Sequence, residues 1–220
     1  MQNSAQIFPN NSAVRKVIAR FVIYTLVMFA ITTSLPLMIE NGDISVFKED
    51  GPIEWLQFTT MILSAIILWC CSYLKGCTLR EIYRFLSLSA TCAAVREMDS
   101  AFDDLIPIIG WKLPAGFCVL LAIIICWKNK DVMAVQMNSF VHTRFFSLLW
   151  CGFIVAVPIA QLVGNGKFLQ LLMGDDYVRD YKRVIEELLE LFGYLLILIG
   201  SLEAILQPKD QSANNAGGDE

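Results

Sequence analysis

Charged side chains are scarce in this sequence, and histidine is almost absent. Of the 220 residues, 17% are charged, and His142 is the single histidine. Ordinary soluble domains carry roughly 25% charged residues, so this deficit points towards a membrane protein. One histidine cannot supply the several histidine ligands of a typical catalytic zinc site.

Motifs of well-known enzyme classes are also missing. The sequence contains no HExxH zinc motif, no phosphate-binding Walker loop, no GxSxG nucleophile turn and no double-histidine pattern of intramembrane hydrolases. A net charge of −4 gives no reason to expect a basic face for nucleic acid, so we expect no nucleic-acid partner. These absences exclude several enzyme classes but indicate no particular reaction.

Long apolar stretches are the main positive feature. There are six of them, at residues 17–38, 53–74, 83–104, 114–128, 143–164 and 184–206. A membrane-spanning helix needs about 20 apolar residues. The pattern therefore predicts an all-α, polytopic bundle of about six transmembrane helices. Residues 1–208 form its single domain, and the polar residues 209–220 form a disordered cytoplasmic tail.

The flanking charges alternate in sign along the chain. The basic segments carry Arg15, Lys16 and Arg20; then Lys75, Arg80 and Arg84; then Lys128, Lys130 and Arg144. The acidic segments between them carry Glu40, Asp43, Glu49 and Asp50; then Asp103 and Asp104; then Asp175, Asp176 and Asp180. Basic loops lie on the cytoplasmic side. We therefore expect both termini inside, in a multi-pass protein of the cell membrane, which is the inner membrane if the source is bacterial.

The third apolar stretch carries charges where a membrane helix should still be in hydrocarbon. Its apolar run from Phe85 to Val95 has 11 residues, which cover about half of a ~30 Å core at ~1.5 Å per residue. Arg96, Glu97 and Asp99 must then lie inside the core or in its outer third. Such charges are costly and usually mark function. The alternative is an internal Arg96–Asp99 ion pair at the interface, on a helix that continues to residue 104.

Two other stretches carry polar stripes towards the same side. In the second, Glu54 suits the N3 position of a helix cap, but it also begins a stripe with Gln57. In the sixth, Glu187, Glu190 and Tyr194 share one face. The alternative interpretation is that these residues lie at a solvent-exposed end of the helix. Glu203 is expected on another face, exposed near the cytoplasmic boundary. If the stripes face inward, the site residues are Glu54, Arg96, Glu97, Asp99, Asp103, Glu187, Glu190 and Tyr194.

Clustered carboxylates hold a proton, bind a cation or pair with arginine. Any metal there would be a hard divalent cation, Mg²⁺, Ca²⁺ or Mn²⁺, on Glu97, Asp99, Glu187 and Glu190.

Three functions remain open. The first is binding or transport of a cation, proton or small charged substrate. The second is a non-catalytic subunit or assembly factor whose stripes pair with a membrane-protein partner. The third is a lipid-phase hydrolase or transferase assisted by a divalent metal. Besides the lipid bilayer, a second copy of the chain is a candidate partner. Six spans make a small transporter, so two copies would be needed to form a transport pathway.

Overall fold

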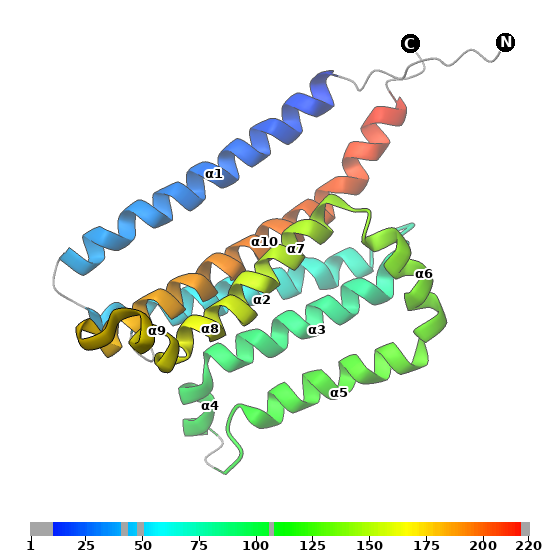
Figure 1. Cartoon of the computed structure of the whole chain (residues 1–220). Helices are drawn as coiled ribbons and strands as arrows, with labels where there is room; N and C mark the ends of the chain where they lie inside the picture. Colours follow the sequence, from blue (N-terminus) through cyan, green and yellow to red (C-terminus); the bar gives the residue numbers. More distant parts are fainter. Residues whose placement is uncertain (1–10, 41–43, 48–50, 106–107, 217–220) are drawn as a thin grey trace. The chain divides into compact units, whose positions relative to one another are not determined.

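The computed structural model describes residues 11–40, 44–47, 51–105 and 108–216, without side-chain detail at a few helix ends, and every regular element in these ranges is helical. The elements are drawn in Figure 1. They are α1 (Asn11–Glu40), η1 (Ile44–Phe47), α2 (Pro52–Ser72), α3 (Arg80–Glu97), α4 (Asp99–Leu105), α5 (Lys112–Lys128), α6 (Lys130–Phe140), α7 (Arg144–Ile154), η2 (Val155–Ile159), α8 (Ala160–Gly164), α9 (Gly166–Met173), η3 (Gly174–Asp176) and α10 (Arg179–Ala216).

Four helices are long and apolar enough to cross a membrane. They cover Val14–Ser34, Pro52–Ser72, Arg144–Gly164 and Arg179–Leu206. The third of these runs continuously through α7, the π-helical turn η2 at Pro158, and α8. The all-helical expectation is confirmed. Helices also cover the two remaining predicted stretches, but α5 has only 17 residues and α3 carries several charges, so six spans stay a prediction.

The chain divides into two compact units. One comprises Met1–Gly42 with Leu206–Glu220, and the other comprises Asp43–Ile205. In the first unit, α1 is a long helix whose hydroxyl side chains bond back to its own carbonyls, as Thr25 does to Phe21 at 2.9 Å. The second unit holds every cavity and ion pair discussed below. The α10 backbone is helical as far as Ala216, so it enters the predicted tail, whose residues 217–220 lie outside the described ranges.

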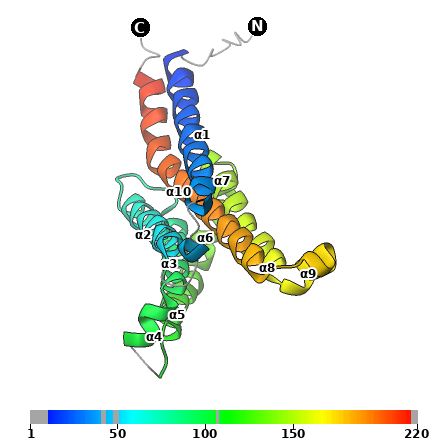
Figure 2. The same cartoon turned by 90° about the vertical axis from the view of Figure 1, so that its left-hand side faces the viewer.

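Small side chains let α2 and α3 pack closely in the second unit. Ser87 Oγ on α3 donates to the Ala65 carbonyl of α2 at 2.8 Å, and both residues are buried. Ala90 and Ala94 continue this contact surface beside Met61. Small residues that bring helix backbones together are typical of membrane helix pairs. In Figure 2, α3 lies between α2 and α5, and both pairs are in contact.

Glycines bring α7 and α10 together in the same way. A Cβ atom added at Gly193 would lie 2.5 Å from the Cβ of Ala156 and 2.6 Å from the carbonyl oxygen of Gly152. Neither contact leaves room for a side chain. Gly152 and Ala156 are four residues apart, so they lie on one helix face, in the small-xxx-small spacing of close helix crossings.

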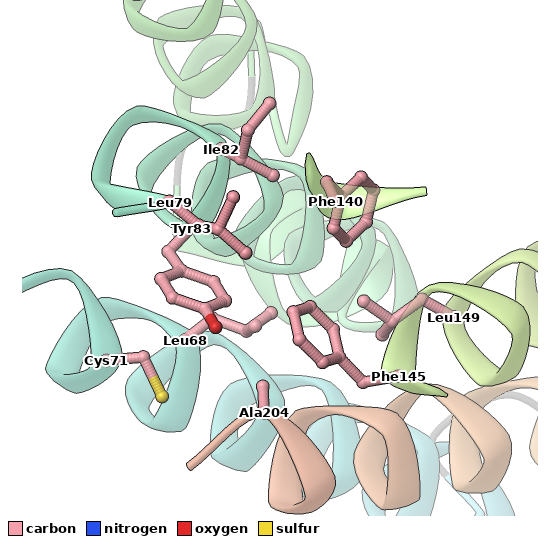
Figure 3. Close-up of a cluster of buried hydrophobic side chains, with 9 residues drawn as sticks. All are labelled: Leu68, Cys71, Leu79, Ile82, Tyr83, Phe140, Phe145, Leu149 and Ala204. Carbon is pink, nitrogen blue, oxygen red and sulfur yellow. The ribbon is translucent and has the colours of Figure 1, made fainter. Parts of the chain in front are cut away.

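One end of this unit is filled by an aromatic cluster (Figure 3). Its members are Leu68, Cys71, Leu79, Ile82, Tyr83, Phe140, Phe145, Leu149 and Ala204. The ring centroids of Tyr83 and Phe145 are 5.8 Å apart, and those of Phe140 and Phe145 are 5.5 Å apart. The cluster joins α2, α3, α7 and α10 with the end of α6.

The α6 helix, which the sequence did not indicate, also fixes the start of α3. Gln136 Oε1 accepts hydrogen bonds from the backbone N–H groups of Glu81 at 3.1 Å and Ile82 at 3.2 Å. These are donors in the first turn of α3, which have no partner within the helix itself. The amide of Gln136 therefore caps α3 from a neighbouring element.

The predicted continuous helix from 83 to 104 is wrong in one respect. The α3 helix ends at Glu97, Met98 leaves helical geometry with φ −112° and ψ 36°, and α4 begins at Asp99. The change of direction at Met98 matters for the site, because it separates Arg96 and Asp99 onto different elements.

Candidate functional site

A hydrogen-bonded group of charged residues joins the end of α3 to α10. Arg96 Nη2 lies 2.8 Å from Glu190 Oε1, and Arg96 Nε donates to Glu97 Oε1 at 3.2 Å. The Tyr194 hydroxyl donates to the same Glu97 oxygen at 2.6 Å. We call Arg96, Glu97, Glu190 and Tyr194 the ionic cluster. It connects two helices that are far apart in the sequence.

The members of the ionic cluster differ in exposure. The side chains of Glu97 and Glu190 are each 5% exposed, whereas that of Arg96 is 43% exposed. One guanidinium therefore faces two shielded carboxylates. Buried carboxylates are stable when paired and hydrogen-bonded, and costly when a partner is lost. When both acids are ionised, the cluster keeps a net negative charge.

A second polar contact ties α2 to α10. Gln57 is fully buried, and its Nε2 donates at 3.0 Å both to the Glu187 backbone carbonyl and to Glu187 Oε2. Gln57 Oε1 has no hydrogen-bond partner among the described residues. The amide thus holds the Glu187 side chain against α2. Its own carbonyl oxygen is a buried acceptor, of a kind that is normally satisfied.

A polar cavity of about 360 Å³ lies beside these contacts. Its walls come from η1, α2, α3, α4, α10 and the residue before α5. They are Phe47, Glu54, Arg96, Glu97, Asp99, Trp111, Arg183 and Glu187. Four carboxylates and two guanidiniums therefore face one small space, with two aromatic rings at its border.

The structure brings together most of the predicted site residues. Arg96, Glu97, Glu190 and Tyr194 form the ionic cluster, and Glu54, Asp99 and Glu187 line the polar cavity together with Arg96 and Glu97. Asp103 does not line this cavity and is exposed on α4. Whether these residues bind a ligand stays a prediction.

The alternative interpretation, an Arg96–Asp99 ion pair, does not hold in the described structure. Arg96 pairs with Glu97 and Glu190, while Asp99 Oδ1 accepts a hydrogen bond from Ser100 N at 2.7 Å. The prediction assumed a continuing helix, and the break at Met98 removes the three-residue spacing on which it depended.

Other residues of the site were missed or given another role. Gln57, which contacts Glu187 beside the cavity, was placed in the polar stripe but not in the site, although its spacing from Glu54 on one helix face was the signal. Trp111 also lines the cavity, and nothing in its local sequence indicates that position. Phe47 was missed, and Arg183, which shares the polar face of α10 with Glu187, was left out of the predicted site.

Glu203, further along α10, corrects another expectation. It was expected to be exposed, but it is 2% exposed. It lies one residue before Ala204 of the aromatic cluster, so tertiary packing covers it.

The carboxylates are not arranged as a metal centre. Among the described residues, no three of His, Cys, Asp and Glu are grouped so as to hold a metal ion. In the ionic cluster, the guanidinium of Arg96 takes the place that a divalent cation would need between Glu97 and Glu190. The geometry therefore gives no support to the predicted Mg²⁺, Ca²⁺ or Mn²⁺ site.

Comparison with known proteins finds no match to a family model, to a curated protein or to a solved structure. The functional argument therefore depends on the cavity and its chemistry.

Proposed function

We propose that this chain is a multi-pass protein of the cell membrane whose polar cavity binds a small, positively charged group. The cavity opens towards the outer face, both termini lie inside, and binding is the first step of transport. The observation that carries the proposal is the lining of the cavity, in which four carboxylates outnumber two guanidiniums.

The size and composition of the cavity suit a protonated amine. About 360 Å³ is within the size range of small-molecule sites, and six of the eight lining residues are charged, so the cavity suits a charged ligand. Glu54, Asp99 and Glu187 offer carboxylate oxygens to an ammonium group, and the Trp111 ring adds a face that attracts cations. An ammonium ion needs no fixed coordination geometry, so it tolerates carboxylates that are not grouped for a metal.

Arg96 supplies a reason why binding can lead to movement. It is bonded to Glu97 and Glu190 and also borders the polar cavity. A cation in the cavity would compete with this guanidinium for Glu97. Because Glu190 lies on α10, release of Arg96 would loosen a contact between α3 and α10. A charged ligand could thus change the packing of two helices through one side chain.

The test measures binding of ethanolamine, a small primary amine, to the full chain in nanodiscs by calorimetry. Wild-type protein is expected to bind it, and the Glu187→Gln substitution should weaken binding at least tenfold, because a hydrogen bond to a charged group is worth about 1.5–3 kcal/mol. The matched control is Glu186→Gln. Glu186 is the neighbouring acid, pairs with Lys182 at 3.4 Å and does not line the cavity.

Equal affinities in the two variants, or no binding to wild-type protein, would overturn the proposal. Ethylene glycol is similar in size to ethanolamine but carries no charge, so it should not bind. Ethanolamine flux into vesicles, measured with the same variants, then tests the transport step separately from binding.

A further inference from the structure

An apolar cavity of about 620 Å³ lies next to the polar cavity. Its walls come from α2, α3, α6, α7, η2, α10 and the residue before α5, and they include Phe85 and Ala93 from α3, and Phe146 and Phe153 from α7. Apart from Arg96 and a few hydroxyl and thiol groups, the side chains that face it are hydrocarbon or aromatic. Such a space suits an apolar chain rather than a polar solute.

The two cavities meet at shared residues. Arg96 and Trp111 line both of them. Tyr194 lines the apolar cavity with its ring and donates its hydroxyl to Glu97, which faces the polar one. The border between carboxylates and guanidiniums on one side and apolar side chains on the other therefore lies at Arg96.

The length of the apolar cavity fits an extended chain. Along α3 it reaches from Arg96 to Ile82, which is about 21 Å at ~1.5 Å per residue. This is a large part of the ~30 Å hydrocarbon core, and it runs along the helix rather than across it.

We infer that the natural ligand is a zwitterionic phospholipid with a primary amine in its head group. The ammonium lies among Glu54, Asp99 and Glu187, the phosphate contacts the guanidiniums of Arg96 and Arg183, and an acyl chain occupies the apolar cavity. This inference rests on the proposed function, because it names the molecule that carries the positively charged group.

Both charge signs in the polar cavity favour a zwitterion. A simple cation would leave Arg96 and Arg183 facing it, and an anionic lipid would bring its phosphate among four carboxylates without a compensating ammonium. Guanidinium groups suit phosphate because their donors match its oxygens. An amine-headed phospholipid offers a partner to each set of charges.

A second apolar groove provides an internal comparison. It lies between α3 and α5, has a volume of about 780 Å³, and includes Val119 and Ala122. It shares no residue with the polar cavity. No head-group contact would select among lipids in this groove, so it should accept the acyl chain of any lipid.

The experiment uses photo-crosslinking of the full chain in phosphatidylglycerol nanodiscs. One probe is a trace of phosphatidylethanolamine with a diazirine in the middle of one acyl chain, and the other is phosphatidylglycerol with the same chain. The phosphatidylethanolamine probe should label α7 peptides at least tenfold more than the phosphatidylglycerol probe does, whereas α3 peptides line both the apolar cavity and the α3–α5 groove and do not separate the two. Both probes should label α5 alike.

Three variants separate head-group binding from chain binding. Glu187→Gln should lower the phosphatidylethanolamine label on α7 about tenfold, in line with the loss of one charge-assisted contact. Ala93→Phe, which fills the apolar cavity, should remove that label while ethanolamine still binds. Val119→Phe, which fills only the α3–α5 groove, should leave it unchanged. If Ala93→Phe does not fold, Met137→Trp fills the same cavity from an exposed position.

The outcomes distinguish this inference from the proposed function. If ethanolamine binds but the two lipid probes label α7 equally, or label only α5, the lipid assignment is overturned and the amine site stands. If ethanolamine does not bind, both proposals are overturned. Label on α7 that depends on both Glu187 and an unfilled apolar cavity supports both.

Discussion

The two ends of the helices α2, α3 and α10 are built on opposite principles. At one end, the aromatic cluster fills the space between helices with rings and aliphatic side chains. At the other, the ionic cluster and the polar cavity place carboxylates and guanidiniums among the same helices. Apolar packing stabilises a fold reliably, whereas buried ion pairs are weak evidence for stability. The comparison assigns most of the stabilising packing to the aromatic end, and it is consistent with the proposal that the charged end binds a ligand.

The largest expected effect comes from disrupting the close contact between α7 and α10. Gly193→Leu would place a side chain against Ala156 and Gly152, where even a Cβ would lie within 2.6 Å. We expect the loss of most folded protein, measured by size-exclusion chromatography after mild detergent extraction. Gly116→Leu is the matched control, because a Cβ there meets no atom within 4 Å. Equal yields from the two variants would contradict the close α7–α10 contact.

Next in size is removal of a ring from the aromatic end. Phe145→Ala should destabilise the protein by about 3–5 kcal/mol, because Phe145 is 1% exposed and packs on Tyr83 and Phe140. Thermal unfolding in detergent measures this effect. Phe117→Ala, at an exposed position on α5, should change the melting temperature little. Ethanolamine affinity per folded molecule should be the same in both variants.

Substitutions at the charged end should lower stability less than substitutions at the aromatic end, and they should change ethanolamine binding more. Arg96→Met should cost about 2 kcal/mol of stability, since the Glu97 and Glu190 carboxylates lose their cation but Arg96 itself is partly exposed. Adding Glu190→Gln should recover part of that loss. A double-mutant cycle from unfolding curves gives the coupling, and strictly additive costs would argue against the pair.

The smallest effect is expected from one hydroxyl group. Tyr194→Phe removes the 2.6 Å hydrogen bond to Glu97 and keeps the ring, so it should cost about 1–2 kcal/mol. Tyr83→Phe likewise removes a tyrosine hydroxyl, but in the aromatic cluster. If the charged end is organised by polar contacts and the other by packing, Tyr194→Phe should also alter ethanolamine affinity, whereas Tyr83→Phe should not.

Much of the architecture follows from local sequence. Long apolar runs predict the helices, and the stripe of Glu187, Glu190 and Tyr194 predicts which face of α10 is polar. The meeting of Arg96 with Glu190 was also expected in outline, because charges with no partner in hydrocarbon must find one on another helix. This reasoning needs only the spacing of residues and the cost of isolated charges.

The rest depends on contacts that spacing cannot encode. The break at Met98 has no proline or glycine to announce it, and it changes the partner of Arg96. The burial of Glu203 follows from its surroundings rather than from its own helix. The role of Gln136 as a cap for α3 joins residues more than fifty positions apart, which no local pattern specifies.

The short interruption of the helix after Glu97 determines where Asp99 lies. On an uninterrupted helix, each residue turns by about 100°, so Asp99 would project about 160° away from Glu97. The break at Met98 places Asp99 at the start of α4, where it borders the same chamber as Arg96 and Glu97. That chamber is therefore assembled by a joint, and inserting one alanine after Met98 should rotate Asp99 away from it while leaving Arg96 in place.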